Sequence, residues 1–453
     1  MRVSRKSLLI LLTVVMYISG EWSQAKSFNV KDFQAKGDGQ TLDTSAIQRA
    51  IDACSHAGGG TVIIPAGEYL CGTLRLASRV TLQLEPGAVV RQSRRPEDHP
   101  RTRHLIVAQE AENVAIVGKG ILRGIGDGDL GRRADRSDAQ MPEFRAGLAL
   151  FEKCRNVTVQ GITCLLSDTW TLTFRFCENV TVEDVTIRNH YFHVNSDGID
   201  PVSCKHVRIA GCRISAGDDC IVLKTVEGKS CEDIKVRDCE LESIATAIKL
   251  GTESSGDFRD IEFADCVVRN STVGIGIYVK DGGTVERIRF ANISLENYTP
   301  TGASNVEGAI FPIFMDIEKR HSDSPLGHIR DVTLENITVT SGFGALVQGT
   351  PEHPIERLTI RNFTFQVRDP QDWGNRRKHI GGRRTLSGQR DTEFARLPGW
   401  LVAAHVRGFT LDGFTLILPP AVKEDPGRQP VILRDAPDSI IRNLIVEGQK
   451  NSP

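Results

Sequence analysis

The sequence predicts an all-β fold: a single-stranded, right-handed parallel β-helix, or solenoid, with an N-terminal capping helix. Two observations lead to this prediction. Short segments in which apolar and polar residues alternate recur along most of the 453-residue chain. Four successive steps between these segments, counted from Asn179, are each 27 residues long. A unit of that length holds about three short strands, whereas a β-propeller blade of ~40 to 45 residues and the leucine-rich consensus fit less well.

The N-terminal 25 residues are expected to be a secretory signal peptide. A basic start is followed by an apolar run from Leu8 to Ile18, and then by small residues, Ser23 and Ala25, spaced like a cleavage site. The run is shorter than the ~20 residues that span a membrane, and no later apolar run reaches that length. We therefore expect residues 26–453 to form one β-helix domain that is secreted or periplasmic and has no membrane anchor.

A capping helix and three strands are predicted next. The helix is capped by Asp43 or Thr44 and ends at Gly58–Gly60. Its apolar face consists of Ile47, Ala50, Ile51 and Cys54. Strands are expected at Thr61–Pro65, Tyr69–Leu76 and Val80–Leu84. A single amphipathic helix before a long run of strands suits a lid over the open end of a stacked core.

Eight clear copies of the repeat follow, and their apolar residues are expected to face the interior. The copies begin at Asn156, Asn179, His206, Asp233, Asp260, Arg287, Asp331 and Arg357. In the copy at His206, the side chains of Val207, Ile209 and Cys212 should be buried, because they alternate with polar residues that point to solvent.

The eleven cysteines follow the same repeat. Cys212, Cys239 and Cys266 lie 27 residues apart, as do Cys204 and Cys231. The first of these columns continues with Ile and Phe in later copies, which indicates a core position where cysteine serves as a small hydrophobic residue. We expect a buried ladder of reduced thiols, although turns stacked at ~4.8 Å would also bring thiols within disulfide range.

Two insertions interrupt the repeat, one at roughly Thr299–Gly327 and one at about Asp369–Pro398. The second contains Trp373 and a basic cluster of Arg376, Arg377, Lys378, Arg383 and Arg384. Loops on a rigid solenoid commonly form its binding site, so this cluster is either a solvated surface or a basic wall for an acidic polymer. The insertions also favour a cleft closed at one end, and hence exo attack.

Overall charge and residue spacing limit the partners. The formal net charge of -1 argues against a nucleic-acid binder that works by bulk positive charge. The acids show no spacing typical of a metal cage, and the 11 histidines are scattered. We therefore expect no metal, no cofactor and no nucleic acid, and a monomeric protein.

Three acids within one repeat, Asp197, Asp218 and Asp219, are the candidate catalytic residues. The period places Asp197 and Asp219 in one column with Thr246, whereas Asp218 is offset by one residue and projects differently. Repulsion among three carboxylates should raise at least one of their pKa values. Glycosidic cleavage needs this kind of arrangement, with a protonated acid for the leaving oxygen and an ionised partner.

Four motifs carry a resemblance to a known family. They are F-E-K-C-R-N-V-T-V from Phe151, S-D-T-W-T-L from Ser167, N-S-D-G-I-D from Asn195 and G-D-D-C-I-V-L-K from Gly217. With them the chain resembles glycoside hydrolase family 28, the pectin-degrading polygalacturonases and rhamnogalacturonases. The resemblance implies that Asp218 is the general acid, that Asp197 and Asp219 activate water, and that the anomeric carbon of an acidic plant-type polysaccharide is inverted. Carboxyl groups on neighbouring turns only ~4.8 Å apart would instead favour retention of the anomeric configuration.

The chain departs from the polygalacturonase pattern in the next two turns. The histidine of the G-H-G motif is replaced by Thr246, and the R-I-K motif reads Tyr278-Val279-Lys280. A phenol does not replace a guanidinium that grips a carboxylate with two hydrogen bonds, which leaves room for a rhamnogalacturonan or another uronic-acid substrate. The substrate-binding candidates are Lys280, Tyr278, Asn195, Lys249, Thr246 and Glu253, followed by Lys224 and Trp170.

Two other functions stay open at this point. A polysaccharide lyase on a similar helix would need a base at carbon 5 of a uronate, and often a calcium cage. A non-catalytic, carbohydrate-binding β-helix would not depend on the three acids. The motifs match the hydrolase pattern.

Overall fold

The computed structural model of the chain describes residues 26–130, 142–297, 310–368, 394, 397–419 and 428–448. The expected signal peptide and the basic cluster of the second insertion lie outside these residues. Within them, no helix is long and apolar enough to cross a membrane.

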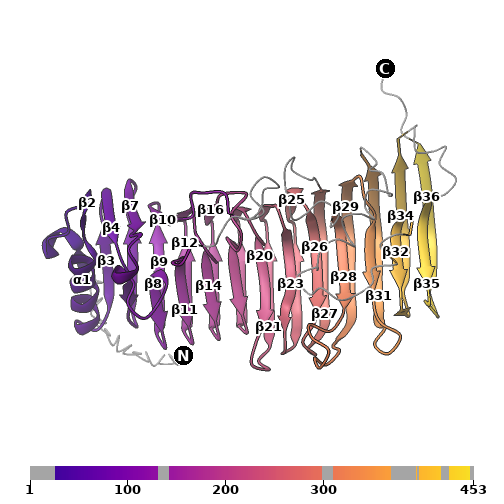
Figure 1. The fold of residues 1–453 in the computed structure, drawn as a ribbon, viewed down its shortest axis with the longest axis horizontal. Coiled ribbons are helices and arrows are strands. Elements are labelled where there is room, and N and C mark those ends of the chain that lie inside the picture. The colour runs from indigo at the N-terminus through magenta and orange to yellow at the C-terminus, as the bar shows by residue number, and fades with distance from the viewer. Residues whose placement is uncertain are drawn as a thin grey trace, which may run out of the picture.

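The chain folds into a parallel β-helix, as predicted (Figure 1). One wall is a 12-stranded parallel sheet, which we call the site wall. Its strands, in chain order, are β5 (Leu74–Leu76), β8 (His104–Gln109), β11 (Gly147–Glu152), β14 (Leu172–Arg175), β17 (Ile199–Val202), β20 (Ile221–Thr225), β23 (Thr246–Ser254), β26 (Val273–Val279), β28 (Phe311–Ile317), β30 (Ala345–Gln348), β32 (Gly399–Ala404) and β35 (Gln429–Arg434).

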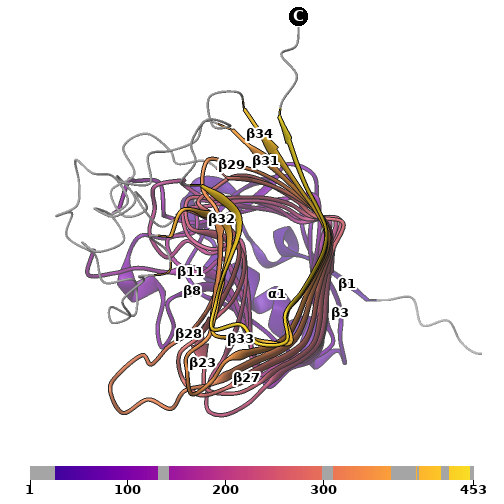
Figure 2. The same cartoon turned by 90° about the vertical axis from the view of Figure 1, so that its right-hand side faces the viewer.

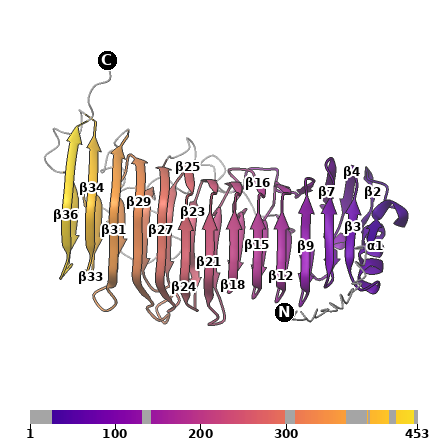
Figure 3. The same cartoon turned by 180° about the vertical axis from the view of Figure 1, so that it is seen from behind.

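A 24-stranded parallel sheet forms the remaining walls, seen side by side in Figure 3. Its strands are β1 (Ser27–Asn29), β2 (Asp38–Leu42), β3 (Gly60–Ile64), β4 (Gly67–Cys71), β6 (Val80–Leu84), β7 (Ala88–Gln92), β9 (Glu112–Gly118), β10 (Ile121–Arg123), β12 (Arg155–Gln160), β13 (Thr163–Leu165), β15 (Glu178–Glu183), β16 (Thr186–Arg188), β18 (Lys205–Ala210), β19 (Arg213–Ala216), β21 (Cys231–Arg237), β22 (Glu240–Ser243), β24 (Phe258–Ala264), β25 (Val267–Ser271), β27 (Thr284–Asn297), β29 (His328–Ser341), β31 (Ile355–Val367), β33 (Val406–Arg407), β34 (Thr410–Leu418) and β36 (Ile440–Gly448).

The capping helix α1 (Thr44–His56) lies across the N-terminal end of the solenoid (Figure 2). Its predicted apolar face is buried. Asp43 stands at the N-cap, but its carboxylate accepts hydrogen bonds from the backbone N–H groups of Lys36 (2.6 Å) and Gly37 (2.8 Å) and not from the helix. Asp43 therefore ties the helix to the preceding loop, which also holds the short 3-10 helix η1 (Val30–Phe33). A second one, η2 (Pro96–Asp98), follows β7.

The prediction of one strand at Tyr69–Leu76 is wrong, because this segment contributes to two strands that lie in different walls. β4 belongs to the larger sheet and β5 to the site wall. The chain turns between them at Gly72, where an added Cβ would lie 2.0 Å from the backbone oxygen of Asp98. Only glycine fits this turn without moving the neighbouring backbone.

The interior is apolar, as the alternation predicts. Val207, Ile209 and Cys212 are buried, and Cys239 and Cys266 continue their column inside the core. All eleven cysteines are buried, and each is a free thiol.

The first insertion is not one loop, contrary to the prediction of a single inserted segment at Thr299–Gly327. It contains β28, which pairs in parallel register with β26 and is buried along its whole length. The extra residues are therefore divided between the two sides of a regular site-wall strand. The repeat pattern did not reveal β28, because a fully buried strand lacks the alternation that marks the other copies.

Candidate active site

The three candidate acids lie midway along the solenoid, where β17, β20 and β23 run side by side. Ile199 pairs with Ile221, and Ile221 pairs with Ile248. This register places Asp197, Asp219 and Thr246 in one column, as the repeat predicts. The three acids are almost completely buried: Asp197 and Asp219 are each 2% exposed and Asp218 is 7% exposed.

The carboxylate of Asp218 faces the loop that precedes β17. Its Oδ2 accepts a hydrogen bond from the backbone N–H of Asn195 at 3.0 Å. Asn195 adopts a left-handed conformation (φ 59°), which asparagine tolerates better than most residues. Its side-chain oxygen accepts a hydrogen bond from Arg145 at 3.1 Å. Asn195, predicted to bind substrate, therefore orients Asp218 through its main chain.

Asp219, one residue later, faces the next turn. Its Oδ2 accepts a hydrogen bond from the ammonium of Lys249 at 2.7 Å, and its Oδ1 accepts one from the backbone N–H of Thr246 at 3.2 Å. Burial disfavours the charged form of Lys249, but the nearby carboxylate of Asp219 raises its pKa above the usual value. Asp218 and Asp219 thus differ in environment, and Lys249 and Thr246 both contact Asp219.

Lys224 is the centre of a second charged group. Its Nζ lies 3.5 Å from Asp197, 3.6 Å from Asp200 and 3.6 Å from Glu253. The same ammonium lies 4.5 Å from the centre of the Trp170 ring. Burial and the charge of Asp200 raise the pKa of Asp197 well above its usual range, which agrees with the expected repulsion among the acids.

Asp200 belongs to this group, although sequence reasoning did not single it out. It is completely buried beneath Lys224. The position of Asp200 within a strand of the site wall was the available signal, since it directly follows Ile199 of the hydrophobic core and pairs in the wall with Thr173. Burial raises the pKa of Asp200 to about 7, with Asp219 and Glu253 adding to the shift and Lys224 opposing it.

This raised pKa predicts a pH-dependent stability. Because the folded protein holds a proton on Asp200 that the unfolded chain gives up near pH 4, the contribution of Asp200 to wild-type stability should fall as the pH rises from 4 through 7. The variant Asp200→Asn cannot ionise, so its stability relative to wild type should increase over that window. Urea unfolding at pH 4 to 8 measures the difference, and an unchanged difference would contradict the assignment.

Tyr278 and Lys280 lie on the C-terminal side of the acids. The Tyr278 ring lies 5.4 Å from the ammonium of Lys249 and 5.8 Å from that of Lys280. Burial raises the pKa of Tyr278 to about 12, so the phenol keeps its proton at neutral pH. Lys280 is 2% exposed and forms an ion pair with Glu318. The carboxylate that contacts Lys280 is thus the protein's own.

A buried polar cluster supports the Asn195 loop, and sequence reasoning did not identify it. Asp168 accepts hydrogen bonds from His193 at 2.7 Å and from the backbone N–H of Ala146 at 3.0 Å, and pairs with Arg145 at 3.4 Å. Although burial opposes it, the hydrogen bond from His193 and the charge of Arg145 lower the pKa of Asp168. The S-D-T-W motif contained this aspartate, but its partners come from two other turns.

Among the described residues, no group of three or more His, Cys, Asp or Glu side chains is arranged to hold a metal ion. The arrangement of acids and lysines supports proton transfer. Lys280 lies beside Tyr278 and is paired with Glu318. The structure brings together these predicted residues: Asp197, Asp218, Asp219, Asn195, Thr246, Lys249, Glu253 and Tyr278.

Comparisons with known proteins show the family to which the chain is similar. The family model described as glycosyl hydrolases family 28 matches residues 54–368. A probable polygalacturonase from Vitis vinifera is 29% identical over 220 residues, which cover 45% of this chain and 45% of that protein. The chain thus spans about half the length of the curated relatives it matches.

Two solved structures share the fold. A hyperthermoactive exopolygalacturonase from Thermotoga maritima superposes with a TM-score of 0.65 at 24% identity, over 76% of this chain and 87% of that one. A family 28 exopolygalacturonase from Yersinia enterocolitica superposes with a TM-score of 0.66 at 18% identity, over 94% of this chain and 79% of that one.

Proposed function

The chain belongs to glycosyl hydrolases family 28, and from this premise we propose that it is an exported hydrolase that cleaves glycosidic bonds in an acidic pectic polysaccharide. The substrate class is a galacturonan or a rhamnogalacturonan. The relatives named polygalacturonase support the choice of polymer. The expectations of export and of a monomer are part of the same proposal.

The observation that carries the proposal is the different surroundings of adjacent acids. Asp219 accepts a hydrogen bond from the ammonium of Lys249, which orients its carboxylate and suits the activation of water. Asp218 accepts a hydrogen bond from the main chain of Asn195 and is assigned the proton that goes to the leaving oxygen. Asp197, paired with Lys224, is assigned to hold the attacking water together with Asp219. Inversion of the anomeric carbon follows from a direct attack by that water.

The surroundings of Tyr278 bear on the sugar bound next to the cleaved bond. Lys280 is neutralised by Glu318 and Lys249 by Asp219. A sugar over the Tyr278 ring would therefore pack against an aromatic face and two paired ammonium groups. This favours a pectic substrate whose sugar at that position is not held by a guanidinium, and it makes rhamnogalacturonan a serious candidate beside homogalacturonan.

Incubation with homogalacturonan and with rhamnogalacturonan tests the proposal. We expect saturated products from at least one of the two, detected by product sizing, without the ultraviolet absorbance of an unsaturated uronide. Absorbance of that kind would identify a lyase, and inertness towards both polymers would overturn the pectic assignment in favour of a binding role.

A further inference from the structure

The loop that carries the hydrogen-bond donor to Asp218 has little regular structure of its own. This Asn195 loop, residues 189–198, connects β16 to β17 and contributes no residue to a strand. Its backbone N–H at Asn195 donates to Oδ2 of Asp218 at 3.0 Å. An oxygen that accepts this hydrogen bond does not carry the acid proton, so the contact assigns the proton of the general acid to Oδ1. The direction in which that proton points therefore depends on what holds Asn195 in place.

Arg145 holds the loop at this residue. Its guanidinium donates hydrogen bonds to the side-chain oxygen of Asn195 at 3.1 Å and to the backbone oxygen of Val194 at 2.7 Å. Asp168 fixes the guanidinium in turn, through its carboxylate at 3.4 Å and through its backbone oxygen. Because the side chain of Arg145 is 13% exposed, water competes little for these charge-assisted hydrogen bonds.

These residues and the general acid lie along one corner of the solenoid, each just before a strand of the site wall. The residues and the strands that follow them are Arg145 and β11, Asp168 and β14, Asn195 and β17, and Asp218 and β20. The four strands pair in this order in the site wall. A chain of contacts thus runs from Arg145 through Asn195 to the general acid, across neighbouring turns.

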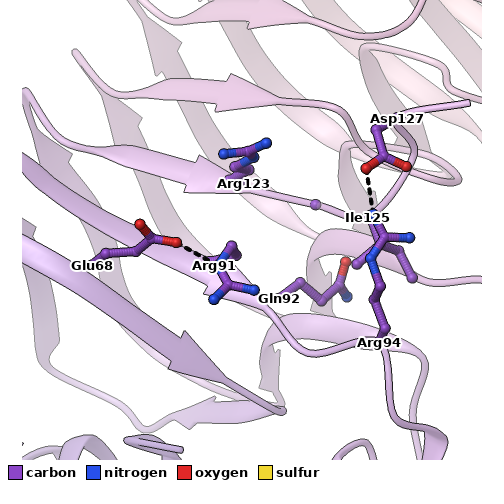
Figure 4. Close-up of a pocket in the computed structure, with 8 residues that line it drawn as sticks. Glu68, Arg91, Gln92, Arg94, Arg123, Ile125 and Asp127 are labelled. Atoms are coloured by element: carbon purple, nitrogen blue, oxygen red, sulfur yellow. Dashed lines mark hydrogen bonds and ion pairs between the residues drawn. The ribbon is translucent and has the colours of Figure 1, made fainter. Parts of the chain in front are cut away.

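A second segment, residues 124–130, holds the middle of the same loop. Its start lines a cavity of about 290 Å³, shown in Figure 4. Beyond the cavity, the backbone oxygen of Gly128 lies 2.6 Å from Nδ1 of His193, and the backbone N–H of Val194 donates to the oxygen of Leu130 at 3.1 Å. These contacts do not involve the side chain of Arg145, so the loop should keep its fold when that side chain is shortened. The guanidinium adds the hold on Asn195 itself.

We propose that Arg145 is a positioning residue for proton donation to the leaving oxygen, because it holds Asn195, whose backbone N–H fixes the carboxyl group of Asp218. The inference rests on the proposed function for the reaction and for the role of Asp218. A displacement of about 1 Å at a catalytic group can cost roughly 100-fold in rate. Since Arg145 acts through Asn195, its loss should slow the chemical step and leave the affinity for substrate nearly unchanged.

The test begins with Arg145→Gln. Asp168 keeps its hydrogen bonds from His193 and from the backbone N–H of Ala146, so the variant leaves no unpaired carboxylate at this position. On the pectic polymer that wild type cleaves, kcat should fall roughly 10- to 100-fold, and KM should change less than about twofold. Arg145→Lys, which keeps the charge, should restore part of kcat. A raised KM with unchanged kcat overturns the inference.

A double-mutant cycle with Asp218→Asn separates positioning of the acid from a general structural defect. If Arg145 acts through Asp218, adding Arg145→Gln to Asp218→Asn should lower kcat no further, and losses that multiply overturn the inference. The matched control is Arg208→Gln. Arg208, on β18 of the larger sheet, likewise pairs with a carboxylate and donates to a backbone oxygen, both of Asp233. This variant should keep the wild-type kcat and KM.

Hydrogen exchange distinguishes failure of this inference from failure of the proposed function, because it needs no activity. Peptides that cover residues 189–198 should exchange their amide protons faster in Arg145→Gln than in wild type, and at the wild-type rate in Arg208→Gln, as measured by mass spectrometry. Equal exchange in Arg145→Gln and wild type overturns the inference, whether or not pectin is cleaved. Faster exchange in a protein whose wild type cleaves no pectic polymer overturns the proposed function and supports the hold of Arg145 on the loop.

Discussion

Replacing Asp218 with asparagine is expected to lower kcat by about 100- to 10,000-fold, the usual contribution of a general acid. The amide cannot give a proton to the leaving oxygen. It can still accept the hydrogen bond from the backbone N–H of Asn195, so the local structure should persist. Reducing-end assays on the pectic substrate measure the rate, and thermal unfolding checks the fold.

The matched control is Asp238→Asn. Asp238 is an exposed residue that directly follows β21 of the larger sheet, and it adopts a left-handed conformation that asparagine also tolerates. We expect this variant to keep wild-type activity. An Asp218→Asn enzyme with full activity would contradict the assignment, because the proton would then have to come from another group.

The variant Lys224→Met is expected to destabilise the protein by about 3–5 kcal/mol at neutral pH, the usual cost of breaking a buried ion pair. Methionine and lysine have side chains of similar length, but in the variant the carboxylates of Asp197 and Asp200 lose the ammonium that lies 3.5 to 3.6 Å away. The loss should shrink near pH 4, because the unfolded chain no longer gains stability there by ionising the two acids, whose pKa values are raised in the folded protein. Urea unfolding at the two pH values measures it.

Two further variants test whether the loss of the ammonium causes the destabilisation in Lys224→Met. Lys205→Met removes an exposed lysine that pairs with Glu232 at 2.8 Å, and it should cost no more than about 1 kcal/mol. Adding Asp200→Asn to Lys224→Met removes one of the two buried acids that have lost the ammonium and should recover part of the stability. Equal losses for Lys224→Met and Lys205→Met would show that Lys224 does not neutralise buried acids.

The repeat made much of the site predictable. A constant period specifies which residues stack in neighbouring turns, so the column of Asp197 and Asp219 and the offset of Asp218 follow from the sequence. The same period predicted the buried cysteines at Cys212 and Cys239. It worked because parallel turns keep one register over many copies.

The period says nothing about side chains that reach across turns. Lys224 meets acids from the turn before and from the turn after its own. Glu318 could not be matched to Lys280, because it follows the strand hidden within the first insertion.

The most direct test of the central claim is proton NMR of the anomeric signals that appear first when the enzyme acts on its pectic substrate. Hydrolysis by water held between Asp197 and Asp219, with Asp218 as the acid, predicts a saturated product whose new reducing end has the inverted configuration before mutarotation. A retained configuration, or an unsaturated uronide, would contradict it.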